Sequence, residues 1–460
     1  SASFQQMATF HCVTTDLTHN SSTVELEAAL QTKGLASSTV MARGYQRLPY
    51  EERSRILTSI LVATSNKQDP SATAMFQECL ASVQRTFARL VQALRSKQIA
   101  SEDLRAKEMA NVCVVMYGGI ARASEADDND RLAQFITPAL TELSGLMSYY
   151  ADDLSVCEQL LRLFRDFTEQ FVIMLDKEQS TILFNASAEL LKSYSAQHCA
   201  SRVVKKVSSE AALEEEQEYS DILCAIQLLI HLGTKDFIDI CSIEGGVDSS
   251  QVTDIIFFGL QQVIPLMTQG LLQFPTLCSH YFSLVGFMMD TYPDKVCVLP
   301  YELFDALMES LLFGMSQVDT VVAKSCLQGI AGIVKEHLKN DTLSDHLASH
   351  PDIFDKCSSR LLKEVVFQPA VWDRLETAGM AVLPLAAVNI QRFGAVVNSL
   401  TQQVPIEQQP RVQSAFQTLL QAEMLSKVSS GGYEGRMNRL RFKKDFEVFV
   451  KEIHSFLVIK

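Results

Sequence analysis

Cysteine and histidine are the residues of this chain best suited to nucleophilic or metal chemistry, and their spacing assembles neither kind of site. A thiol and an imidazole lie close in sequence at Cys278 and His280, and again at His198 and Cys199. Residues one or two positions apart on a helix point in different directions, so neither pair is placed to act as nucleophile and base or to chelate zinc well. We interpret each pair as a buried cysteine beside a partly exposed histidine.

Short catalytic and phosphate-binding motifs are also missing from the sequence. It contains no G-x-G-x-x-G or P-loop pattern, no H-E-x-x-H and no G-x-S-x-G. The adjacent glycines Gly118 and Gly119 lie inside a helical pattern, where small residues permit close packing of helices. We therefore predict that the chain is not an enzyme and has no catalytic, cofactor-binding or metal site.

Charged runs are the remaining candidates for a binding site. The densest acidic cluster comprises Glu210, Glu214, Glu215, Glu216 and Glu218, and leads into a helix that carries Asp221. Such a run either favours the start of a helix through the helix dipole or contacts lysine and arginine of a partner. The only compact basic run comprises Arg436, Arg439, Arg441, Lys443 and Lys444. For this run a solvated final helix is favoured over a membrane or nucleic-acid role.

Amphipathic helices in paired succession are the elements that must position these charges. In residues 152–175, Leu160, Phe164 and Phe171 recur at three- and four-residue steps on one face, with charged residues opposite. Helix pairs follow one another about every 40–50 residues, which is the spacing of HEAT or armadillo repeats. We predict an all-α fold: an α-solenoid of HEAT-type helical hairpins, with about eight helix pairs and a C-terminal helix over residues 41–460. Residues 1–40 are predicted to be polar and mostly irregular, with one short helix near residues 24–33.

The composition agrees with a large helical protein inside the cell. The 54 acidic and 40 basic residues give a net charge of −14, which argues against broad nucleic-acid binding. Unpaired, scattered cysteines indicate a reducing compartment, and no apolar stretch reaches membrane-spanning length free of interruption. We therefore expect no direct nucleic-acid contact and no membrane insertion.

Several stretches resemble a known family of proteins. The most specific is Phe274-Pro-Thr-Leu-Cys278, within residues 263–278. Other similar stretches follow in matching order at residues 48–52, 214–219, 234–240, 292–295, 299–308 and 449–460. Together they resemble the carboxy-terminal half of an exportin, a nuclear export receptor of the karyopherin-β (importin-β) family. The similarity runs from about Gly44 to the carboxyl end.

This resemblance implies a transport function. Karyopherins of this type are HEAT-repeat superhelices that bind protein cargo together with Ran in its GTP form. They cross the nuclear pore through phenylalanine-glycine nucleoporins and shuttle between nucleus and cytoplasm. The implied cargoes are basic proteins such as hypusinated translation factor five-A, and also Smad proteins. The alternative is a non-transport HEAT-repeat scaffold that organises a protein complex, which explains the helices equally well but not the similar stretches.

The candidate partner-binding residues follow from the same helical pattern. The second helix of a HEAT pair normally lines the concave wall, and an acidic wall suits a basic cargo. Protein-binding residues are predicted at Asp152, Asp153, Glu158, Asp166, Glu169, Glu214, Glu215, Glu216, Glu218 and Asp221.

Overall fold

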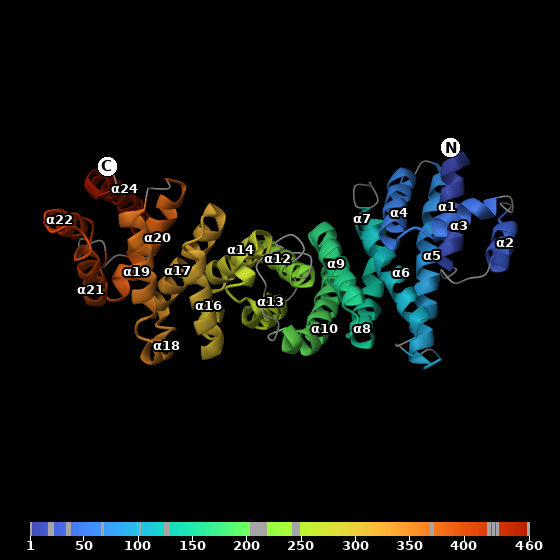
Figure 1. Ribbon diagram of the computed structural model, residues 1–460, viewed down its shortest axis with the longest axis horizontal. Coiled ribbons are helices and arrows are strands. Elements are labelled where there is room, and N and C mark those ends of the chain that lie inside the picture. The colour runs from blue at the N-terminus through green and yellow to red at the C-terminus, as the bar shows by residue number, and fades with distance from the viewer. Residues whose placement is uncertain are drawn as a thin grey trace. The chain divides into compact units, whose positions relative to one another are not determined.

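Helices account for the regular secondary structure throughout the described part of the protein (Figure 1). The computed structural model describes residues 2–16, 23–33, 38–65, 69–98, 100, 103–123, 129–202, 219–241, 249–368, 372–420, 425, 428 and 432–457. No strand occurs in these ranges. The chain divides into two compact units, which we call unit 1 (Ser1–Leu266) and unit 2 (Met267–Lys460).

Unit 1 is a double-layered stack of helices. Helices α4, α6, α9 and α12 pack on one another in that order, and α8, α10 and α13 form a second succession beside them. The pairs α8–α9 and α12–α13 connect the two layers. The helices of the unit are α1 (Ala2–Asp16), α2 (Thr23–Thr32), α3 (Thr39–Gln46), α4 (Tyr50–Thr64), α5 (Pro70–Arg95), α6 (Leu104–Ala121), α7 (Asn129–Ile136), η2 (Thr137–Ala139), α8 (Leu140–Tyr149), α9 (Leu154–Phe171), α10 (Lys177–Arg202), α12 (Ser220–Cys241), α13 (Ser249–Val263) and η3 (Ile264–Leu266).

Unit 2 repeats this plan. Helices α14, α17, α20 and α24 pack in succession, and α16, α19, α21 and α22 form the second layer. Its helices are η4 (Leu271–Gln273), α14 (Pro275–Thr291), α15 (Pro293–Cys297), α16 (Tyr301–Gly314), α17 (Thr320–Asn340), α18 (Ser344–Ser349), α19 (Ile353–Phe367), α20 (Trp372–Val388), α21 (Ile390–Thr401), α22 (Gln409–Leu419) and α24 (Gly432–Leu457). Stacked helical hairpins of this kind confirm the predicted all-α fold of HEAT type.

Aspartates at the helix starts explain where several of these helices begin. Asp69, Asp103, Asp153 and Asp319 each precede a helix and accept a hydrogen bond from the backbone N–H two residues later, at 2.8–3.1 Å. These bonds satisfy N–H groups that have no partner within the helix. Asp153 is therefore the N-cap residue of α9.

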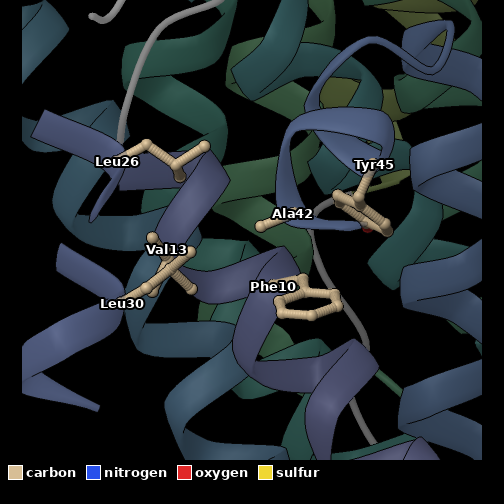
Figure 2. Close-up of a cluster of buried hydrophobic side chains, with 6 residues drawn as sticks. All are labelled: Phe10, Val13, Leu26, Leu30, Ala42 and Tyr45. Carbon is tan, nitrogen blue, oxygen red and sulfur yellow. The ribbon is translucent and has the colours of Figure 1, made fainter. Parts of the chain in front are cut away.

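The first 40 residues differ from their prediction. Helix α2 matches the short helix expected near residues 24–33, but α1 was not expected, so the prediction of a mostly irregular segment was wrong. Figure 2 shows the reason: Phe10 and Val13 of α1 share a buried cluster with Leu26, Leu30, Ala42 and Tyr45. Residues 10–15 of α1 are all buried, so this helix has no polar stripe for periodicity to detect.

A buried polar cluster joins α1 to α3 and α4. The His11 Nδ1 atom lies 2.9 Å from the Tyr45 hydroxyl, and Arg53 lies over the Tyr45 ring at 5.6 Å from its centroid. His11 and Arg53 are 0% and 1% exposed. Burial, with a smaller contribution from Arg53, lowers the pKa of His11 to about 3. His11 is therefore neutral in the folded protein at every pH above this value.

This cluster predicts a pH dependence of the stability of unit 1. An unfolded histidine titrates near pH 6.5, so the unfolded chain binds more protons than the folded one between about pH 3 and pH 6.5. Stability is thus lost as the pH falls through about 6.5. Lowering the pH from 7 to 5 is expected to reduce the free energy of unfolding of the wild type by about 2 kcal/mol more than that of His11→Gln. In this variant residue 11 no longer titrates. Urea unfolding at both pH values measures this difference, and parallel profiles of the two proteins would contradict it.

The glycines of α6 permit a close approach of α4. A Cβ atom on Gly119 would collide with the Ser54 side chain and lie 3.0 Å from the Ser54 carbonyl oxygen. The Thr58 hydroxyl also donates to the Gly119 carbonyl at 2.7 Å. The predicted packing role of this glycine pair is confirmed for Gly119.

Candidate protein-binding surface

Five of the acidic residues predicted to bind a partner lie on helix α9 or directly before it. Asp152 precedes the helix and is exposed, as is Glu169 near its end. Asp153 caps the helix and also lies 3.9 Å from Lys107 Nζ of α6. Glu158 accepts a hydrogen bond from Arg162 at 2.6 Å, one turn later on the same helix. Asp152 and Glu169 are therefore the most available carboxylates of this group.

Asp166 lies in the interior and not on an open face. It is 4% exposed, and its carboxylate accepts from Arg122 of α6 at 2.9 Å and from Arg165 at 2.5 Å. Burial is the largest single influence on Arg165 and lowers its pKa, but Asp166, Cys224 and Glu169 together outweigh burial and raise the pKa of Arg165 above its usual value. Two arginines thus neutralise this buried carboxylate.

The Asp166 cluster extends across four successive helices. Arg122 donates to Ser54 of α4 at 2.9 Å, and Arg165 donates to Gln227 of α12 at 3.2 Å. Side chains of α4, α6, α9 and α12 are thereby connected in one polar ladder. A buried network of this kind fixes the relative positions of stacked helices more than it presents charge to a partner.

The other predicted residues lie either in the interior or outside the described residues. Asp221 is 3% exposed and accepts a hydrogen bond from the Tyr194 hydroxyl at 2.6 Å. Glu214, Glu215, Glu216 and Glu218 lie outside the described residues. Asp166 and Asp221 are buried and cannot belong to an acidic surface that meets a partner. The candidate surface therefore contains fewer residues than predicted.

An apolar groove in unit 1 is a second candidate surface that the sequence does not reveal. It has a volume of about 770 Å³ and lies among α5, α6, α7, η2 and α8. The Tyr117 and Phe135 rings stack in its wall with centroids 5.7 Å apart, and Phe87 meets Tyr117 edge-on at 5.4 Å. At the rim, Arg95 of α5 donates to Glu142 of α8 at 2.5–2.6 Å.

A 3₁₀ turn interrupts the helical segment beside this groove, so residues 129–149 do not form one continuous α-helix. Pro138 lies in the 3₁₀ turn η2, which separates α7 from α8. Proline has no N–H to donate and clashes with the preceding turn, so the segment bends there. Pro138 and Phe135 line the groove.

The thiols and imidazoles form no site in the described residues. Cys278 is buried, and burial raises the pKa of its thiol to about 11. His280 instead lies 2.8 Å from the Thr276 carbonyl through its Nδ1 atom. The interpretation of this pair as a buried cysteine beside a histidine of intermediate exposure is confirmed. The side chains of His198 and Cys199 lie outside the described residues.

The described residues contain no group of three or more histidine, cysteine, aspartate or glutamate side chains placed to hold a metal ion. None of their helices combines the length and the apolar character needed to cross a bilayer. The surfaces that remain are the acidic part of α9, the apolar groove and the outside of the helical stacks.

These features define a helical repeat protein of HEAT type, a class that binds other macromolecules over extended surfaces. A comparison with known families then identifies the group: residues 40–460 match the family described as Exportin-4. The chain belongs to the exportin-4 family. This family consists of karyopherin-type nuclear export receptors, and its members are transport receptors that are generally not enzymes.

Proposed function

We propose that this chain is a segment of a receptor that exports protein cargo from the nucleus when Ran is in its GTP form. The observation that carries the proposal is the family match over residues 40–460, which spans both helical units. Stacked hairpins suit this function, because small shifts between packed helices allow a repeat protein to adapt to two partners. Such a receptor shuttles between the nucleus and the cytoplasm.

The proposed cargo is a basic protein such as hypusinated translation factor five-A. The net charge of −14 supports this choice, since complementary charge steers association and disfavours acidic competitors. Within the described residues, Asp152 and Glu169 are the exposed carboxylates proposed to meet it, with Asp153 and Glu158 beside them. Charge reversal of Asp152 and Glu169 with no loss of cargo affinity would contradict this placement.

The experiment that tests the receptor function compares the two nucleotide states of Ran. Ran-GTP and Ran-GDP are titrated onto the full-length protein, each with and without hypusinated factor five-A. A receptor predicts a preference for Ran-GTP and mutual strengthening of Ran and cargo, because two ligands that favour one state must favour each other. Equal binding of both nucleotide forms would contradict the proposal and favour the alternative HEAT scaffold.

Phenylalanine-glycine nucleoporins are the partners proposed for the apolar groove. A phenylalanine ring suits the groove because its wall is built from Phe87, Tyr117 and Phe135. Small residues such as Ala88 and Ala139 leave room between the aromatic side chains. The exposed Ala88 on α5 is a position where a charge would enter the groove without disturbing the core.

Ala88→Glu is expected to weaken the binding of a phenylalanine-glycine peptide at least about fivefold, because a carboxylate in an apolar groove loses hydration when a ring enters. Ala74→Glu, at another exposed position of α5, is the control and leaves the affinity unchanged. Fluorescence anisotropy with a labelled peptide measures both. Equal affinities of the two variants would place the nucleoporin contact elsewhere.

A further inference from the structure

Helix α24 carries apolar side chains on the face that points away from its own unit. Its inner face packs Phe442, Phe446, Phe449 and Ile453 against the unit, each at most 3% exposed. At about 100° per residue, Met437, Leu440, Lys444 and Val448 fall together on the opposite side. We call these four residues the α24 outer face.

The exposed fractions agree with this helical arrangement. Met437 is 46% exposed, Leu440 49% and Val448 62%. Single exposed apolar residues are ordinary on a protein surface, but these three lie in one row on one helix. The row extends over residues 437–448, whose eleven steps at about 1.5 Å each cover about 17 Å of helix. It therefore presents three turns of apolar surface to the solvent.

Basic side chains outnumber acidic ones beside this row, which Glu434 and Glu447 of the same helix also flank. Lys444 lies within the α24 outer face, and Arg436 and Arg441 flank it. Arg441 has only a 4.0 Å contact with Asp445. Arg436 and Lys444 make no ion pair with any residue that the structure describes. Lys443, by contrast, is used within the unit, because its Nζ lies 2.9 Å from a carboxylate oxygen of Glu376.

Helix α24 as a whole carries more positive than negative charge. Its six lysine and arginine residues outnumber its four aspartate and glutamate residues, in a chain whose net charge is −14. The combination of an apolar row and a mainly cationic border suits a partner with the complementary pattern.

We propose that the α24 outer face is a docking surface for an acidic amphipathic helix of a partner protein. Apolar residues of such a helix at three- and four-residue steps would pack on Met437, Leu440 and Val448. Glutamates and aspartates along its borders would meet Arg436, Arg441 and Lys444, which gives both orientation and a fast association rate. This inference rests on α24 alone and does not depend on the proposed export function.

The pattern fits other macromolecules less well. A nucleic acid would use the cations but gain nothing from the apolar row. A helix that lies on a membrane normally buries a broad apolar face rich in tryptophan, phenylalanine or leucine. The α24 outer face has no aromatic residue, and Lys444 interrupts its apolar row. An acidic helix matches both its charge and its dimensions.

The test uses the full chain and a synthetic helical probe. The probe is a labelled peptide of about 20 residues with leucine on one face and glutamate on the borders, and a scrambled peptide of the same composition is its control. We expect the probe alone to bind, with an affinity that falls as salt rises from about 50 to about 300 mM. Hydrogen exchange is expected to slow in residues 436–448 when the probe is bound.

Matched variants locate the site. Lys444→Glu and Leu440→Gln are each expected to weaken binding about tenfold. Lys192→Glu on α10 and Val321→Gln on α17 change equally exposed residues elsewhere and are expected to have no effect. All four positions are at the surface, so circular dichroism should show an unchanged fold.

Four outcomes would overturn the proposal. Equal binding of the scrambled peptide, or insensitivity to Lys444→Glu, would exclude a specific acidic helix at this face. Binding of the chain to vesicles with phosphatidylserine, lost in Leu440→Gln while the probe does not bind, would identify a membrane instead. If the probe does not bind, and if the chain self-associates in a way that Leu440→Gln abolishes, a second copy of the chain covers the face.

Discussion

Gly332→Ala is expected to lower the free energy of unfolding of unit 2 by about 2 kcal/mol. Gly332 lies where α17 crosses α14, and a Cβ atom there would be 2.5 Å from the Met289 carbonyl oxygen and 3.1 Å from the Asp290 Cα. Both obstacles are backbone atoms, which cannot rotate away as the end of a flexible side chain does. The two helices must separate to admit one methyl group, and the contacts around it weaken.

The same interface has a second close contact that explains its sensitivity. A Cβ atom on Gly286 of α14 would lie 2.7 Å from the Ser325 carbonyl oxygen of α17. Glycine residues on both helices, Gly286 of α14 and Gly332 of α17, therefore allow this close crossing. Urea unfolding of the chain, combined with hydrogen exchange in α14 and α17, measures the loss and locates it in unit 2.

Gly394→Ala is the matched control for this prediction. Gly394 lies within α21 of the same unit, and a Cβ atom there would meet nothing within 4 Å. Alanine is the better helix former, so this variant is expected to raise stability by about 0.5–1 kcal/mol. If both variants shift stability in the same direction, the close approach of α14 and α17 is not the cause.

Helices with a clear apolar stripe were predictable from the sequence. The apolar spacing in residues 152–175 predicts a helix, and α9 (Leu154–Phe171) lies within this range. In α9, Leu160, Phe164 and Phe171 are fully buried, as the spacing predicts. The buried stripe ends with the helix, and Met174 beyond it is 42% exposed.

The features that periodicity missed have a different physical origin. Helix α1 is buried on most sides, so polar residues such as His11 and Thr14 lie inside and conceal its apolar pattern. The groove depends on a bend at Pro138 and on Phe87, which precedes it by 51 positions in the chain. Such a site arises only when separate helices pack, and no short sequence window contains it.

The burial of single acidic residues was also not predictable from the sequence of one helix. Helical spacing places Asp166 with Glu158 and Glu169 on the polar face of one helix. The structure separates them, because Arg122 lies 44 positions earlier in the chain and covers Asp166 from α6. Spacing along one helix cannot show which part of its polar face another helix covers.

Asp166→Asn is accordingly expected to destabilise unit 1 by about 2–3 kcal/mol. The substitution keeps the shape of the side chain but removes the charge that Arg122 and Arg165 share. Breaking a fully buried ion pair costs about 3–5 kcal/mol, and the estimate is reduced here because the Arg122 side chain is 40% exposed and keeps part of its hydration. Urea unfolding with hydrogen exchange in α6, α9 and α12 measures the effect.

Glu169→Gln separates a structural role from a partner-binding one. It removes the same charge from an exposed position of the same helix and is expected to change stability by less than about 0.5 kcal/mol. If the acidic surface meets a basic cargo, Glu169→Gln weakens cargo binding at unchanged stability, whereas Asp166→Asn loses stability first. A stable Asp166→Asn protein with impaired cargo binding would reverse this assignment, because only a carboxylate that faces the partner behaves in that way.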